Sequence, residues 1–178
     1  MHTFAVYVED RPGVLNRVAS LFRRRGFNIQ SLAVGGSEIP GVSRMTVVVE
    51  TSDGGARRIE AQLYKIVDVM RVENITSRSA VVRDLALIKL TADLTTRSAI
   101  LQLAQVFEAR VVDVAPDSLV LEMCGAEARI DRLLDVLRPY GVLEMVRTGR
   151  IAMGRAGADT AAVTDCPAAV DEGIAYSV

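Results

Sequence analysis

The sequence predicts an α+β protein built from two tandem βαββαβ units. Apolar residues alternate with a period of two in some segments, as in strands, and recur every three or four residues in others, as in helices. Turns rich in glycine, proline and small polar residues separate these segments. The same order of segments then occurs a second time, within a chain of 178 residues that is long enough for two small domains.

The first unit begins with the segment Phe4–Val8, whose aromatic and β-branched residues are typical of a strand. A helix follows and is expected to end at Gly26, because glycine adopts the left-handed conformation that terminates helices. The remaining strands are expected at 28–34, 43–50 and 72–76, with a second helix from about Ser52 to Met70. The side chains expected on the two buried helix faces are Val14, Leu15, Val18, Leu21 and Phe22, and then Ile59, Leu63, Ile66, Val67 and Met70.

The second unit repeats this order. Its strands are expected at 85–91, 111–114, 119–124 and 142–148, with one helix starting at Thr95 or Thr96 and another ended by Pro139 and Gly141. Each unit is thus a split βαβ, the ferredoxin-like arrangement. We therefore expect a first domain at 1–77, a linker at 78–83, a second ferredoxin-like domain at 84–155 and a mobile tail at 156–178. The tail is predicted from its many small residues and its lack of periodicity.

Composition and charge argue against nucleic acid and membrane partners. The formal net charge is −1, whereas proteins that grip phosphate backbones carry a basic excess. The second and third strands contain no aromatic residue, which RNA binding on such a sheet requires. The basic run Arg23–Arg25 is interpreted as the solvated end of a helix. With no visible signal peptide or membrane span, and two cysteines without metal-type spacing, we expect a reducing, cytoplasmic location.

Residue types that catalyse reactions are scarce. His2 is the only histidine and lies at a terminus expected to fray, and Cys124 lies in an apolar strand where a core position is expected. No nucleophile–base pair, metal-ligand cluster or nucleotide-binding glycine motif is recognisable. The pair Gly35-Gly36 is either a plain loop or a weak phosphate cradle. We therefore predict no catalytic residue and no metal site, and a function other than catalysis.

The turn Asp10-Arg11-Pro12-Gly13, between the first strand and the first helix, is the strongest candidate binding site. Amides at a helix start are free donors, and the helix dipole favours an anion there. Pro12 sets φ at the helix entry, and Gly13 lets a ligand approach the backbone closely. The Asp10 carboxylate would hold an ammonium group, so the turn fits a free α-amino acid. The alternative is that Asp10 caps the helix and the Pro-Gly pair only turns the chain.

Six segments of the chain share their sequence pattern with one known family. The first, VEDRPGVLNRVASLFRRRGFNIQSL, is similar to the first strand, helix and second strand of an ACT domain. The others are SRMTVVVE, QLYKIVDVMRVENIT, RDLALIKL, VFEARVVDVAPDSLVLEMCG and RTGRIAMGR. Together they resemble the small regulatory subunit of acetolactate synthase (acetohydroxyacid synthase) over about residues 2–155.

This resemblance implies a non-catalytic chain that associates with a separate large subunit. In that family the large subunit uses thiamin diphosphate, Mg²⁺ and FAD to condense two pyruvates, or pyruvate with 2-oxobutyrate. The small subunit raises this activity and confers feedback inhibition by a branched-chain amino acid, usually valine, in branched-chain amino acid biosynthesis. It forms a homodimer through its ACT domains, with the effector at their interface. A stand-alone ACT-type amino-acid sensor that regulates another enzyme or transcription is the alternative.

The resemblance also implies the effector-binding residues. Gly13, Val14 and Leu15 would offer backbone amides to the effector carboxylate and apolar contact to its side chain. Asn28 and Ile29, in the segment GFNI, would line the site from the partner chain. Asp10 stands where the family often has asparagine, so effector preference or affinity is expected to differ here.

Overall fold

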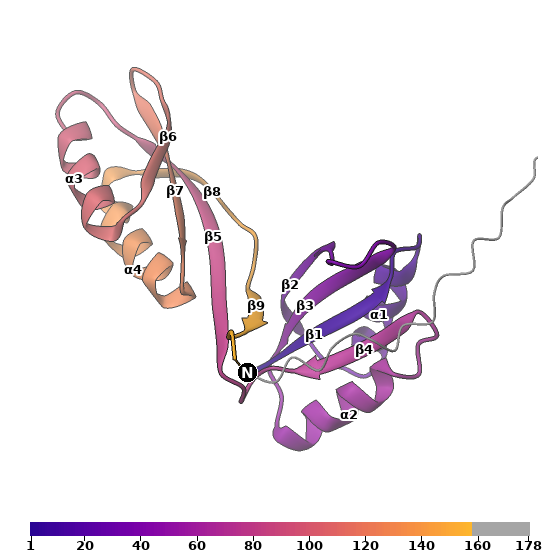
Figure 1. Cartoon of the computed structure of the whole chain (residues 1–178). Coiled ribbons are helices and arrows are strands. Elements are labelled where there is room, and N and C mark those ends of the chain that lie inside the picture. The colour runs from indigo at the N-terminus through magenta and orange to yellow at the C-terminus, as the bar shows by residue number, and fades with distance from the viewer. Residues whose placement is uncertain (158–178) are drawn as a thin grey trace, which may run out of the picture.

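The first domain of the computed structural model, which describes residues 1–157, is an ACT-like βαββαβ unit. Its elements are β1 (His2–Glu9), α1 (Val14–Arg24), β2 (Ile29–Gly36), β3 (Val42–Val49), α2 (Asp53–Leu63) and β4 (Val69–Asn74). The strands form an antiparallel sheet in the order β2-β3-β1-β4, and both helices lie on one face of it (Figure 1). The predicted fold of this half is confirmed, and β2 and β4 are its edge strands.

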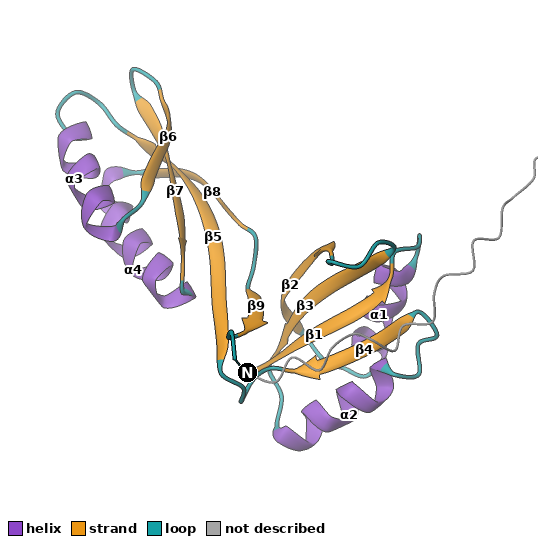
Figure 2. Ribbon diagram, viewed as in Figure 1, coloured by secondary structure: helices purple, strands orange, loops and turns teal. Residues whose placement is uncertain are grey.

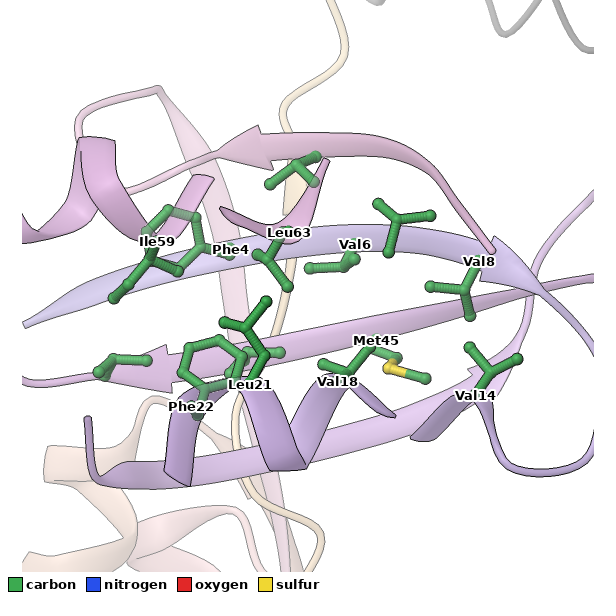
Figure 3. Close-up of a cluster of buried hydrophobic side chains, with 14 of the residues drawn as sticks. Phe4, Val6, Val8, Val14, Val18, Leu21, Phe22, Met45, Ile59 and Leu63 are labelled. Atoms are coloured by element: carbon green, nitrogen blue, oxygen red, sulfur yellow. The ribbon is translucent and has the colours of Figure 1, made fainter. Parts of the chain in front are cut away.

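An apolar core lies between this sheet and its two helices. Phe4, Val6 and Val8 alternate along β1 and point to the same face, so all three are buried. In Figure 3 they lie opposite the α1 side chains, which include the buried Val14 and Val18. Because Val14 is the first residue of α1 and is itself in the core, packing fixes the position at which the chain enters this helix.

The second domain repeats the topology. Its elements are β5 (Ala80–Thr91), α3 (Arg97–Phe107), β6 (Arg110–Val114), β7 (Ser118–Gly125), α4 (Glu127–Leu137), a 3₁₀ turn at Arg138–Tyr140, β8 (Val142–Arg147) and β9 (Ile151–Gly154). Figure 2 shows α3 and α4 on one side of the second sheet, whose strand order is β6-β7-β5-β8. Its core joins Ile88 and Leu121 of the strands to Ile100 and Ile130 of the helices. The ferredoxin-like prediction is therefore confirmed here too.

An extended β5 connects the two domains. Residues 80–83 pair antiparallel with 151–154 of β9, a short strand that the sequence pattern did not predict. Ala152 of β9 packs against Ala5 of β1, and the Arg44 side chain on β3 donates a hydrogen bond of 2.5 Å to the Ala152 carbonyl oxygen. The segment expected as a linker thus consists largely of paired strand. The tail expected to be mobile lies, beyond residue 157, outside the described residues.

The second helix is shorter than its apolar spacing predicts. α2 ends at Leu63, and two tight turns follow, in which Ile66 N–H donates to the Leu63 carbonyl and Val69 N–H to the Ile66 carbonyl. Val67 is 95% exposed in this turn, and Met70 already belongs to β4. Apolar residues of the turns and of β4 happen to continue the helical spacing of α2, so the sequence pattern predicted a helix that was too long.

The sole histidine is buried and does not fray. β1 starts at His2, whose exposed fraction is 8%. Its ring stacks on Phe4 at a centroid distance of 6.5 Å, and its Nε2 atom lies 3.4 Å from the Asp53 carboxylate. Pairing of the first strand thus orders the chain from its second residue, contrary to the expectation of a frayed terminus.

The expected core position of Cys124 is wrong. Side chains alternate along β7, so Leu121 and Met123 face the core while Cys124 points to the exposed face. The apolar neighbours of Cys124 in the sequence gave no sign that β7 has one buried and one exposed face.

Leu15 also differs from expectation, because it is 44% exposed although its spacing placed it on the buried face of α1.

Candidate functional site

The turn between β1 and α1 has the backbone geometry that its glycine predicts. Gly13 precedes the first helical residue and has φ of +87°, in the left-handed region that residues with a Cβ atom rarely adopt. Nothing lies within 4 Å of the place where a Cβ of Gly13 would stand, so the space beside this backbone is open. Gly13 therefore allows the backbone to turn and leaves space for a ligand beside that backbone.

Asp10 does not cap α1. The helix has no side-chain cap, and the Asp10 carboxylate instead accepts a hydrogen bond of 3.0 Å from the Ser43 hydroxyl on β3. The backbone N–H of Asp10 donates to the Gly41 carbonyl oxygen at 2.8 Å. Two contacts to the β2–β3 hairpin thus hold an exposed carboxylate beside the helix entrance, and the capping alternative is excluded.

The start of α1 retains unpaired donors. Within the described residues, no acceptor pairs with the amide N–H groups of Leu15 and Asn16, whereas the Val14 amide makes a long turn bond of 3.4 Å to the Arg11 carbonyl. These donors add to the positive end of the helix dipole. The turn therefore presents donors for a small anionic group, with the Asp10 carboxylate on the same side of the domain as an acceptor for a cationic group.

The structure separates the six expected site residues into two groups. Asp10, Gly13 and Leu15 surround the turn, and the exposed Leu15 side chain is available for apolar contact. The Val14 side chain belongs to the core, so it can offer only its backbone. Asn28 and Ile29 lie beyond the other end of α1, which spans eleven residues and is therefore about 16 Å long.

Sequence reasoning missed Ser43 as the partner of Asp10. The two residues are 33 positions apart, and the register that pairs Val8 with Ser43 brings the hydroxyl next to the turn. Register is decided by the packing of whole strands and not by a local motif. A small polar residue at the start of the third predicted strand was the only available signal.

The corresponding turn of the second domain is closed by its own side chain. The Asp93 carboxylate accepts hydrogen bonds from the backbone amides of Thr95 and Thr96 at 2.9 and 2.8 Å, and from both of their hydroxyls. The Thr95 hydroxyl, followed by the amide and hydroxyl of Thr96, lowers the pKa of Asp93 to about 2. Both threonines precede α3, which begins at Arg97 and, like α1, has no side-chain cap, so the Asp93 carboxylate is satisfied within its own turn.

The side chains and helices of residues 1–157 also bear on metal binding and on membrane insertion. No group of three or more histidine, cysteine, aspartate or glutamate side chains in this part of the chain is arranged to hold a metal ion. None of the helices in the same part is both long enough and apolar enough to cross a membrane. The turn at Asp10–Gly13 remains the candidate site.

Comparison with known proteins gives family models and relatives that match most of the chain. Residues 4–71 match the family model described as an AHAS small subunit-like ACT domain, and residues 83–156 match that of the small subunit of acetolactate synthase. The acetolactate synthase small subunit of Mycolicibacterium smegmatis is 47% identical over 154 residues, which cover 86% of this chain and 91% of that protein. A probable acetolactate synthase small subunit from Archaeoglobus fulgidus is also 47% identical, over 86% of this chain and 96% of its own length. The crystal structure of the Thermotoga maritima acetolactate synthase small subunit is similar with a TM-score of 0.83 and 38% identity, covering 87% of this chain and 97% of that one.

Proposed function

We infer the function of this chain from the family to which it belongs, the acetolactate synthase small subunits. As a regulatory subunit, it is proposed to bind a separate large catalytic subunit and to raise the rate at which that subunit forms acetolactate. The thiamin diphosphate, Mg²⁺ and FAD of the reaction would reside in the large subunit. The contribution of this chain is then binding and conformational control, and its proposed site of action is the cytoplasm.

The proposed effector is a branched-chain amino acid, with valine as the first candidate. The observation that carries this proposal is the open helix start, where unpaired amides lie beside the positioned Asp10 carboxylate. The amides of Leu15 and Asn16 would receive the effector carboxylate, and Asp10 its ammonium group. The exposed Leu15 side chain supports a preference for an aliphatic effector.

A homodimer would complete this site. β2 pairs with β3 on one side, and its other edge has no strand beside it within the described chain. A two-fold axis perpendicular to the sheet at this edge would pair two β2 strands in antiparallel fashion, with Ile29 of one beside Gly36 of the other. Gly36 pairs with Ser43, the partner of Asp10. Asn28 and Ile29 of the second copy would thus approach the Asp10 turn, which one chain alone cannot bring about.

Feedback inhibition then follows from differential binding. An effector held between two copies favours the dimer arrangement in which both halves of its site meet. It can shift the large subunit only by the difference between its affinities for the two arrangements. Coupling of this kind typically amounts to about 1–3 kcal/mol.

Reconstitution tests the regulatory role. The chain is mixed with the large catalytic subunit, and acetolactate is measured with and without valine, leucine or isoleucine. We expect the mixture to form acetolactate faster than the large subunit alone, and valine to reverse part of this gain. If the chain alone forms acetolactate, the non-catalytic assignment is wrong; if the mixture is no faster than the large subunit, the chain regulates something else.

Calorimetric titration of the full chain with valine tests the effector site directly. Heat and an increase in Tm at millimolar valine are expected. Absence of both, with and without the large subunit, would remove valine as the effector. The same titration with leucine and isoleucine then decides whether the site takes any branched-chain amino acid.

A further inference from the structure

The loop between β8 and β9, residues 148–150, contacts the strand that leads away from the proposed effector residues. The Arg150 backbone N–H donates a hydrogen bond of 2.8 Å to the Ser31 hydroxyl on β2. These residues are 119 positions apart and belong to different domains. The contact joins the edge strand of the first sheet to the second domain.

Gly149 makes this close approach possible. A Cβ atom at this position would lie 2.5 Å from the Ser31 Oγ atom, a separation that real Cβ atoms essentially never show. Its φ of +81° is also in the left-handed region, so a side chain would be strained by the backbone as well. The left-handed conformation therefore favours glycine here, and a Cβ atom would force the Ser31 hydroxyl out of its present position.

On the second-domain side, the loop is held by several bonds. The Thr148 hydroxyl donates to the Asp84 carboxylate at 3.1 Å and accepts from the Leu85 amide at 3.2 Å. The neighbouring Arg147 and Arg150 side chains pair with Asp131 and Glu127 of α4. The loop, the β5 strand and α4 are thus tied together, so a displacement of the loop is expected to displace α4 with it.

On the first-domain side, Ser31 is only two residues from Ile29. The β2–β3 register shifts between these two residues, which is where a bulge changes the direction of a strand. Ile29 is half-buried against the first core, and Ser31 is half-buried under the loop. Because Ser31 is only about two residues along the strand from Ile29, a displacement of Ile29 is expected to displace Ser31 as well.

Other contacts hold the domains together without involving β2. Arg44 of β3 donates to the Ala152 carbonyl oxygen, and Ala152 packs with Ala5 and Ile75. These contacts join the central part of the first sheet to β9. Removal of the Ser31 hydroxyl should accordingly leave the domains docked while it releases the edge strand from the loop.

We propose that the Ser31–Gly149 contact is the link through which the second domain senses effector occupancy at the start of β2. The inference rests on the proposed effector site and adds to it a route within one chain. Effector contact with Asn28 and Ile29 shifts β2, and Ser31 passes the shift to the loop at 148–150. The second domain, through α4 and β5, then changes its position relative to the first.

The test compares three variants of the full chain: Ser31→Ala, Gly149→Ala, and Ser20→Ala as a matched control on α1, remote from the second domain. Valine affinity is measured by calorimetry, and amide hydrogen exchange is followed in peptides that cover residues 147–154. In the wild-type chain, valine should change the exchange of the Arg150 amide. Inhibition by valine is then measured in the reconstituted enzyme.

We expect Ser31→Ala to bind valine as tightly as the wild type but to lose the valine-dependent change in exchange. Its reconstituted enzyme should need about fivefold more valine, or a greater excess, for half-inhibition. Gly149→Ala should show the same separation of binding from inhibition, and Ser20→Ala should match the wild type. If Ser31→Ala and Gly149→Ala both bind valine as the wild type does and keep its exchange change and its inhibition, the link is wrong but the effector site stands. Absence of valine binding to the wild type overturns the effector site and the link together.

Discussion

The two domains share one topology but differ at the turn that follows their first strand. In the first domain, Gly13 opens the turn, and the Asp10 carboxylate accepts a hydrogen bond from Ser43 and does not cap the helix. In the second domain, the Asp93 carboxylate itself binds the amides of Thr95 and Thr96. The aspartate of the first turn thus bonds across to β3, whereas the aspartate of the second turn bonds within the turn itself. Because neither helix has a side-chain cap, the two turns differ in how many of their own donors occupy the aspartate carboxylate.

The largest expected effect is a loss of stability in one domain when its core is truncated, with the other domain unaffected. Phe4 is fully buried in the first core, and Phe4→Ala should lower the free energy of unfolding of that domain by about 3–5 kcal/mol. Hydrogen exchange should then accelerate in β1 and β3, while β7 and α4 stay protected. The reciprocal variant Ile88→Ala, in the second core, should show the opposite pattern. Equal acceleration in both domains would show that they unfold as one unit.

A smaller effect is expected when the open turn is closed. Gly13→Ala places a Cβ atom at a left-handed residue, which should cost about 1–2 kcal/mol of folding free energy. Valine binding should weaken as well, because relief of this strain displaces the helix amides. Gly154→Ala is the matched control, since that glycine has open space around it and no left-handed φ. Denaturation and calorimetry measure the two effects, and an unchanged valine affinity would place the effector elsewhere.

The charge of Asp10 is expected to matter more for the ligand than for the fold. Asp10→Asn keeps an oxygen that can accept from Ser43 but replaces a charge-assisted hydrogen bond to the effector ammonium with a neutral one. Valine affinity should fall about tenfold, which corresponds to about 1.4 kcal/mol. Asp93→Asn, the matched change in the second domain, should leave valine binding unaltered. If Asp10→Asn also leaves it unaltered, Asp10 only anchors the turn to β3.

The smallest effect is a pH dependence confined to the closed turn. The pKa of Asp93 is lowered from 3.8 to about 2 in the folded chain, so its contribution to stability is present above pH 3.8 and is lost as the pH falls toward 2. Asp93→Asn should therefore weaken the dependence of stability on pH between 4 and 2. Denaturation at several pH values measures this, and a slope identical to that of the wild type would contradict the lowered pKa.

Much of the fold could be predicted because its signals are local. The alternation in Phe4–Val8 and the helical spacing of Val14, Val18 and Phe22 follow from periods of two and of 3.6 residues, which need only a short window of sequence. The glycine turn at Asp10–Gly13 was likewise visible as a motif. The same window fails at element ends, where the apolar residues of β4 continue the period of α2 past Leu63.

Local patterns alone thus account for the order of the elements as far as β8, for most of their buried side chains, and for the turn that presents free amides. The tertiary structure decided that Asp10 faces Ser43, that Cys124 is exposed, and that Gly149 lies against Ser31. Each of these facts depends on strand register or on domain packing, which brings together residues as many as 119 positions apart. Since register and docking are set by the burial of whole faces, no short motif can specify such a contact.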